Sequence, residues 1–103
     1  MKAVITLQNL VDKGACSLMV RRFKKLFGDR VVVTIKKAKE HSWDFRMGWA
    51  WAADVLLTAK ARQRFFASWN KKGYWDLIEK EQEKLDAETF ARLFLVPSNR
   101  RKM

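Results

Sequence analysis

Basic side chains dominate the residues of this sequence that could do chemistry, and they gather in its first part. Residues 1–42 hold ten Lys and Arg against three Asp and Glu, a net charge of +7, whereas residues 74–103 hold six of each. Such a surplus of positive charge suits phosphate groups or an acidic protein surface, although a solvated face without a ligand is the plainer interpretation. The predicted nucleic-acid-binding residues are Arg21, Arg22, Lys24, Lys25, Arg30, Lys36, Lys37 and Lys39.

A second candidate site is the aromatic and basic segment from Phe65 to Trp75. Aromatic rings interleaved with lysines can stack on the bases of single-stranded nucleic acid. The near-helical spacing of the rings favours a place in the core for most of them, with Trp75 and one other ring exposed. Exposed rings would suit a protein partner or a homodimer. This alternative protein-binding site comprises Trp69, Lys71, Lys72, Tyr74 and Trp75.

Residues for catalysis are few. Cys16 and His41 are the only members of their types, and we expect a small apolar filler and a solvated helix end, respectively. Clusters of Cys and His that bind metal need more of these residues, and the four glycines stand too far apart for a phosphate-binding loop. We therefore predict a protein that is not an enzyme and uses no cofactor or metal.

Composition also predicts a compartment. A single cysteine allows no internal disulfide, the first residues do not resemble a signal peptide, and no apolar run approaches the roughly 18 residues of a membrane span. These features predict a cytoplasmic protein that makes no use of a membrane.

The elements that would position the basic residues are short helices, because one proline and four glycines leave few breaks. The fold class predicted is mainly α: a compact bundle of about four to six short helices with one short extended segment near Val31–Thr34. That segment is β-branched, and it is expected to be a buried connector or to pair with residues near Val4–Ile5. We expect one helical domain over residues 1–97 and a flexible basic tail over residues 98–103.

Helix boundaries follow from caps and spacing. Thr6, Thr34, Asp44 and Thr58 are expected N-caps, and Gly14 and Gly28 are expected helix ends. Gly73 is either a joint or a weak point in a longer helix. At Asp86 the apolar stripe that begins at Tyr74 loses its phase, so either the helix breaks there or its last turns pack on another element. The expected helices cover Leu7–Lys13, Ala15–Phe27, Ile35–His41, Phe45–Leu57, Ala59–Trp69 and a last segment from Tyr74 that Pro97 ends.

The first two expected helices, joined through Gly14, have the layout of a helix-turn-helix. In that interpretation the second helix offers Ser17, Arg21, Arg22 and Lys25 to a major groove. Any helical hairpin with a glycine turn shares this spacing, so the layout alone does not separate DNA reading from general phosphate binding.

An ordered set of short motifs extends over about residues 5–95. Gly14-Ala15-Cys16 is followed by Phe23, Phe27-Gly28 and Val31–Thr34, and the set continues with Trp49-Ala50, Leu56-Leu57, Ala61-Arg62 and Phe90-Ala91-Arg92. This pattern resembles a group of small proteins encoded in phages and prophages. The resemblance implies a mobile-element product in a bacterial cytoplasm. From the basic surface and the exposed rings we expect nucleic acid, a host nucleoprotein complex or a host protein as partner. The resemblance assigns no functional residue, and strong basicity sets this chain apart from the group.

Overall fold

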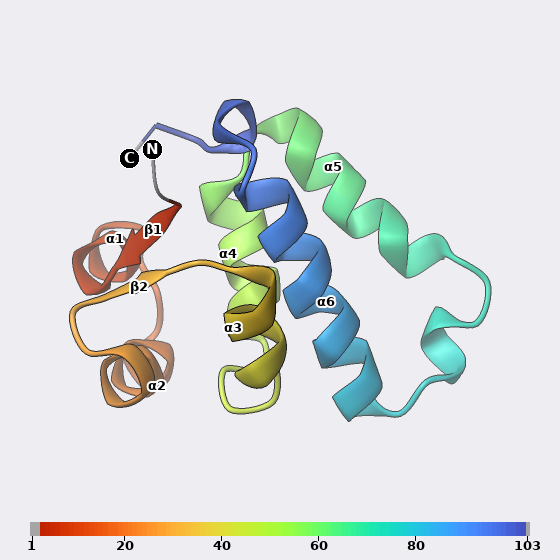
Figure 1. Cartoon of the computed structure of the whole chain (residues 1–103), viewed down its shortest axis with the longest axis horizontal. Helices are drawn as coiled ribbons and strands as arrows, with labels where there is room; N and C mark the ends of the chain where they lie inside the picture. Colours follow the sequence, from red (N-terminus) through yellow and green to blue (C-terminus); the bar gives the residue numbers. More distant parts are fainter. Residues whose placement is uncertain (1–2, 103) are drawn as a thin grey trace.

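The computed structural model describes residues 3–102, and within that range the chain is mainly helical, as predicted. Six α-helices are joined by short connections, with one two-stranded sheet (Figure 1). The helices are α1 (Leu7–Asp12), α2 (Ser17–Phe27), α3 (Ile35–Glu40), α4 (Gly48–Leu56), α5 (Ala59–Ala67) and α6 (Glu79–Phe94). Short 3-10 turns occupy η1 (Ser68–Asn70), η2 (Tyr74–Asp76) and η3 (Pro97–Asn99).

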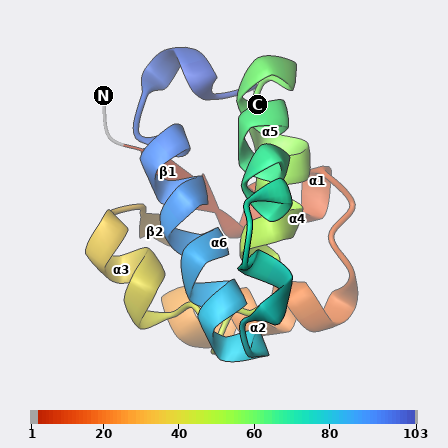
Figure 2. The same cartoon turned by 90° about the vertical axis from the view of Figure 1, so that its right-hand side faces the viewer.

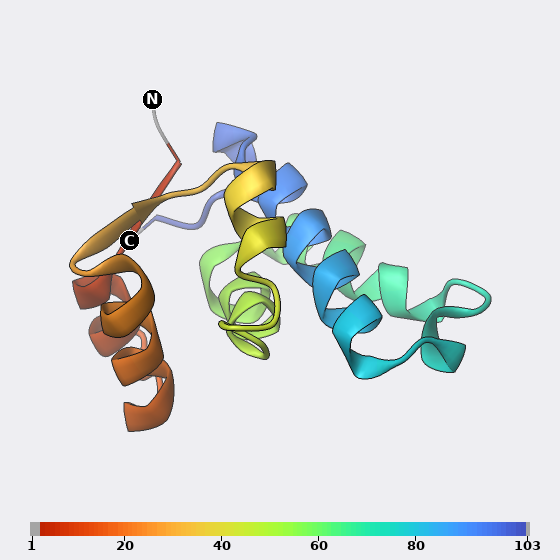
Figure 3. The same ribbon diagram turned by 60° about the horizontal axis from the view of Figure 1, so that its bottom comes forward.

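A small unit at one end of the molecule combines the sheet with α1 and α2 (Figures 1 and 3). Strands β1 (Val4–Thr6) and β2 (Arg30–Val32) pair antiparallel with Ile5 opposite Val31, so of the two alternatives left by the sequence the structure has the pairing. Thr6 ends β1 and caps α1 through a reciprocal capping box with Asn9. Gly28 ends α2 with φ 71°, a conformation that glycine adopts readily. The cap at Thr6 and the helix end at Gly28 are both as the sequence predicted.

The long helix α6 organises the rest of the fold, since α3, α4 and α5 all pack on it (Figures 1 and 2). A chain of aromatic rings joins it to the N-terminal unit. Phe23 of α2 lies 6.0 Å from Phe45, and Phe45 lies 5.3 Å from Trp49. Trp49 in turn lies 5.9 Å from Phe90 of α6. Each of these rings is at most 4% exposed, so the chain of rings forms the centre of the core.

The start of α4 differs from the expectation. The helix begins at Gly48, not at Phe45, and Asp44 does not cap it. Residues 43–47 instead form tight turns, in which Arg46 N–H donates to the Trp43 carbonyl and Gly48 N–H to the Phe45 carbonyl. Met47 closes the segment with φ 68°, the one positive φ among the non-glycine residues that the structure describes. The cause is packing: the Phe45 ring lies so close to the Gly48 backbone that a Cβ there would overlap it.

The last long helix also differs from the expectation. Gly73, with φ 90°, is a true joint, and Tyr74 lies in η2 before the helix begins at Glu79. No break occurs at Asp86, because α6 runs unbroken from Glu79 to Phe94. The apolar stripe changes phase there because the Asp86 side chain is itself buried, at 4% exposure. The helix ends at Phe94, three residues before Pro97.

Residues 98–102, where a free tail was expected, begin with ordered contacts. The Thr58 N–H donates to the carbonyl of Asn99, and the Arg101 N–H donates to the carbonyl of Leu56. Arg100 forms a bridge with Leu57, and its guanidinium donates to the Phe94 carbonyl. The segment is therefore fastened to the junction between α4 and α5. The last residue of the expected tail, Met103, lies outside the described residues.

Candidate functional site

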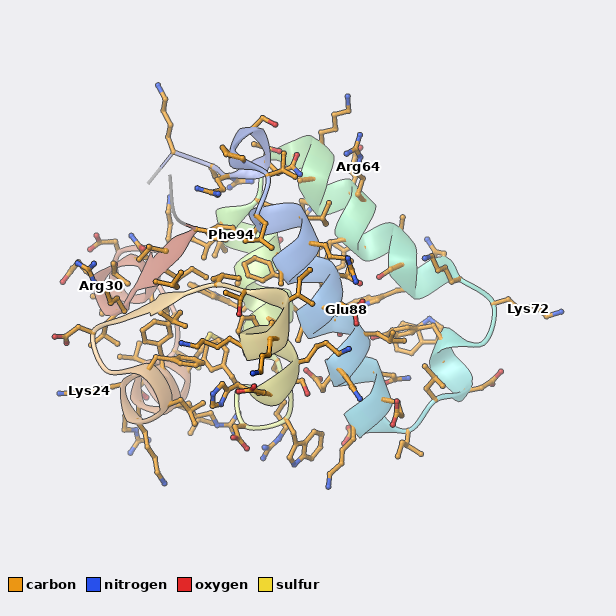
Figure 4. All side chains as sticks on the ribbon, viewed as in Figure 1. Lys24, Arg30, Arg64, Lys72, Glu88 and Phe94 are labelled. Carbon is orange, nitrogen blue, oxygen red and sulfur yellow. The ribbon has the colours of Figure 1, made fainter. Side chains whose placement is uncertain are left out.

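The eight predicted basic residues lie on three consecutive elements, of which α2 and β2 belong to the unit that holds the sheet and α3 packs on α6 in the middle of the molecule (Figure 1). Seven of them are exposed and Arg22 is half-buried. Lys24 and Arg30 point outward at the left of Figure 4, whereas Lys72 points outward at the far right. Helix α2 contributes Arg21, Arg22, Lys24 and Lys25, β2 contributes Arg30, and α3 contributes Lys36, Lys37 and Lys39.

Most of these cations keep their charge free of a protein partner. Lys39 lies 3.5 Å from Glu88 of α6, and Lys36 lies 4.0 Å from Glu40 in its own helix. Within residues 3–102 none of the other six forms an ion pair. Exposed pairs of this kind contribute little free energy, so even Lys36 can turn to a ligand at small cost.

Two of the predicted residues converge on a hollow, and a residue that the sequence did not indicate joins them. The hollow has a volume of about 440 Å³ and is lined by Arg22, Lys25, Leu26, Asp44 and Arg46. Its lining comes from α2 and from the turn of residues 43–47. The other six predicted cations do not line it, and Arg30 lines a separate hollow beside Thr6 and Leu7.

Arg46 owes its place to the turn before α4. Its guanidinium donates to the Trp43 carbonyl at 3.1 Å and lies over the Trp43 ring, 4.6 Å from the ring centroid. The Arg22 guanidinium donates to the Arg46 carbonyl at 3.4 Å. A helix through residues 45–57, as expected from the sequence, would not bring these groups together. The three-residue spacing of Trp43 and Arg46 was the one available signal.

At the opposite end, η1, η2 and α6 enclose a groove of about 380 Å³. Tyr74, Leu77 and Leu85 supply its apolar lining, and Lys71, Lys72, Ser68 and Thr89 supply the polar lining. Of the three rings predicted for protein binding, Tyr74 is buried, Trp69 is half-buried and only Trp75, at 64% exposed, presents its ring to solvent. The structure therefore brings Lys71, Lys72 and Tyr74 together in the groove, and Trp69 and Trp75 do not line it.

Asp86 fixes this groove from behind. Its Oδ1 accepts hydrogen bonds from Trp69 Nε1 and from the Tyr74 hydroxyl, each 2.9 Å long. Burial raises the pKa of the Asp86 carboxyl, and the two hydrogen bonds oppose that rise. Burial, together with the hydrogen bond and charge of Asp86, raises the pKa of Tyr74, which keeps its hydroxyl a donor. In the sequence Asp86 marks only the point where the apolar stripe loses its phase, and no local pattern shows that two rings donate to it.

Glu83, one turn before Asp86, joins α6 to the turn of residues 43–47. Its Oε1 accepts a hydrogen bond from the Met47 N–H at 2.9 Å. Burial raises the pKa of Glu83, while the Met47 hydrogen bond lowers it. Two hydrogen bonds therefore hold the turn that carries Arg46. The Arg46 guanidinium donates to the Trp43 carbonyl within the turn, and the Met47 N–H donates to Glu83 of α6.

Cys16 is exposed at the N-cap of α2 and is not the expected apolar filler. His41 lies at the end of α3, as expected, but it is half-buried, with its ring 5.1 Å from that of Phe27. The described part of the chain contains no group of three or more His, Cys, Asp or Glu that could hold a metal ion. No helix of residues 3–102 is long and apolar enough to cross a membrane.

Comparisons with known proteins give no matching family model, no matching curated protein and no matching solved structure.

Proposed function

We propose that this protein is a non-enzymatic phage or prophage accessory protein, cytoplasmic in a bacterial host, that binds nucleic acid or a nucleoprotein complex. The binding face is the basic surface, defined here as the eight predicted cations together with Arg46. The observation that carries the proposal is the convergence of Arg22, Lys25 and Arg46 on one hollow in which Asp44 is the only carboxylate. Three cations held around one concave site suit a phosphate group. The phage context rests on the motif resemblance.

The charge distribution supports a backbone-directed contact. The six cations without an ion-pair partner lie on α2, β2 and α3, and the protein carries a net charge of +11. Such a surface attracts phosphates whatever the base sequence. Reading of a major groove by α2, as in a helix-turn-helix, is a narrower form of the same proposal, since Ser17, Arg21 and Lys25 are all exposed.

A matched pair of double charge reversals tests the proposal. Arg21→Glu with Lys25→Glu changes one Arg and one Lys, four residues apart, on α2, and Lys60→Glu with Arg64→Glu makes the same change on α5. Both variants lose the same net charge. Fluorescence polarisation on a labelled duplex, from about 50 to about 200 mM salt, should show a salt slope lower by roughly 1.8 for the α2 variant, because two phosphate contacts are lost.

The α5 variant should keep the wild-type slope. Equal losses in the two variants would mean that net charge alone drives binding. Absence of any binding by the wild-type protein at low salt would refute the proposal outright.

A protein partner or a second copy of the chain is the other candidate, and the groove beside η2 favours it. Lys71 and Lys72 line an apolar hollow there, and the exposed Trp75 lies next to it in the chain. Under this proposal Trp75→Ala weakens the partner complex, whereas the α2 double variant does not. Sedimentation of the protein alone and a pull-down with Trp75→Ala as the control separate the two occupants.

A further inference from the structure

Like charges around the basic hollow are held in place by the protein and not by a counter-ion. Arg22 and Arg46 both line the hollow, where mutual repulsion would drive free side chains apart. Each guanidinium is instead anchored on a carbonyl of residues 43–47, Arg22 on that of Arg46 and Arg46 on that of Trp43. The cations are thus positioned before any ligand arrives.

Trp43 extends this arrangement to a third element. Its ring carries Arg46 at 4.6 Å and, at 5.5 Å, the ammonium of Lys80 from the first turn of α6. Tryptophan is the ring that binds cations best. The turn of residues 43–47 lies between α2 and the start of α6 (Figures 1 and 3). The Trp43 ring therefore links Arg46 to the start of α6, where Lys80 lies between Glu79 and Glu81.

The hollow is poorly neutralised from within. Asp44 is its only lining carboxylate, and Asp44 Oδ2 lies 3.6 Å from His41 Nδ1. No ion pair joins Asp44 to Arg22, Lys25 or Arg46. The donors left around the hollow are two guanidiniums and one ammonium, the groups that bind phosphate oxygens in proteins.

We infer that the hollow is a clamp for one backbone phosphate of nucleic acid, with Arg22, Lys25 and Arg46 as its donors and Trp43 as the residue that positions Arg46. This inference rests on the proposed function and makes it specific. Trp43 is a positioning residue and not a stacking platform, because its ring already carries two cations. The clamp reads the phosphate and not the base, so it serves single strands and duplexes alike.

The presence of the clamp is tested with a matched pair of arginine variants. Arg46→Ala removes a clamp donor, and Arg64→Ala removes an exposed arginine of α5 that forms no ion pair within residues 3–102. The probes are a labelled oligothymidylate and a labelled mixed-sequence duplex, titrated over about 50–200 mM salt. Arg46→Ala should lower the salt slope by about 0.9 on the duplex and about 0.7 on the single strand, and Arg64→Ala should change neither.

The role of Trp43 is tested with two variants of similar bulk. Trp43→Leu keeps an apolar side chain but removes the π face, and Trp43→Phe keeps a face. We expect the Leu variant to lose affinity equally on both probes, by about threefold, and the Phe variant to recover most of it. Thermal melting of each variant reports whether the fold is kept, and the arginine pair does not depend on that outcome.

Three results would overturn the inference. Equal slopes for Arg46→Ala and Arg64→Ala would show that no clamp exists. If Trp43→Leu lost affinity for the single strand alone, Trp43 would be a base-stacking residue. If Trp43→Leu kept the wild-type affinity for both probes, Trp43 would have no role in binding. Failure of the proposed function is distinct, because it appears as absence of binding by the wild-type protein.

Discussion

The two ends of this molecule use charged side chains in opposite ways. At the basic end, Arg22, Lys25 and Arg46 surround a hollow and keep their charge available to a ligand. At the groove end, the carboxylate of Asp86 is buried and accepts hydrogen bonds from two aromatic side chains. The first arrangement leaves three cations without an ion-pair partner among the described residues, whereas in the second a buried carboxylate is hydrogen-bonded within the fold. The difference explains why the sequence, which shows both as charged residues on helices, does not separate function from scaffold.

The largest effect expected is that of Asp86→Ala, which breaks only the groove end. It leaves the Trp69 indole N–H and the Tyr74 hydroxyl without their acceptor. A buried donor without a partner costs about 1–3 kcal/mol, so the free energy of unfolding should fall by about 3 kcal/mol in a urea titration. Affinity for duplex should stay at the wild-type value under conditions where the variant is folded.

Asp76→Ala is the matched control, because Asp76 is exposed and makes no side-chain hydrogen bond in the described part of the chain. A similar loss of stability in both variants would mean that Asp86 has no special structural role.

A smaller effect is expected of Gly48→Ala, which disturbs the basic end. The added Cβ overlaps the Phe45 ring, and overpacking of this kind costs about 1–3 kcal/mol. Alanine gains about 1 kcal/mol over glycine in a helix, which offsets part of the loss. The net change should be about 1 kcal/mol of destabilisation, with a lower salt slope for nucleic acid because the turn that carries Arg46 moves.

The double variant Phe45→Leu with Gly48→Ala should be less destabilised than the sum of the single changes, since the smaller side chain makes room for the Cβ. Strict additivity in this cycle would contradict the packing argument.

The smallest expected effect is the change in the free energy of unfolding with pH, and its sign differs between the carboxylates of Asp86 and Glu88. Burial raises the pKa of Asp86 in the folded protein above its ordinary 3.8. In the window between these values the folded state binds more protons than the unfolded state, so acidification through the window favours folding. The stability of the wild-type protein relative to Asp86→Asn should therefore rise as the pH falls from neutral towards 3.8.

Glu88 provides the opposite case. A hydrogen bond from Arg92 and the nearby Lys39 lower its pKa below the ordinary 4.5. Stability that Glu88 contributes is present above that value and is lost as the pH falls through the folded pKa. The advantage of the wild-type protein over Glu88→Gln should thus shrink on acidification, and a parallel trend in the two pairs would contradict the assignment.

Much of the fold could be predicted from local signals. Thr6, Thr34 and Thr58 cap helices as expected, because each side-chain oxygen accepts a hydrogen bond from a backbone N–H three residues on. The pairing of β1 and β2 was predicted from β-branched residues. Where the sequence failed, a side chain distant along the chain determined the outcome. The Phe45 ring delays the start of α4, and Trp69 and Tyr74 draw Asp86 into the core.

The candidate site was predictable in composition but not in shape. The sequence indicates which residues are basic, and five of the eight lie on α2 and β2 at one end of the molecule, whereas the other three lie on α3, which packs on α6. It does not indicate that Trp43 and Arg46 fold back in a turn, nor that Lys80, 37 positions beyond Trp43 in the sequence, lies over the same ring. Both facts depend on tertiary contacts, which periodicity and caps do not encode.

The bridge between Leu57 and Arg100 has a consequence for how the chain opens. Together with the hydrogen bond from the Arg101 side chain to the Leu57 carbonyl, 44 positions away, the bridge closes a long loop that contains α5, η1, η2, α6 and η3. Inside that loop, Asp86 of α6 attaches η1 and η2 to α6 through the side chains of Trp69 and Tyr74. A segment attached at both ends gains little conformational entropy when only one attachment breaks. We therefore expect neither attachment to break by itself. Helix α5 and the groove beside it therefore form one cooperative unit.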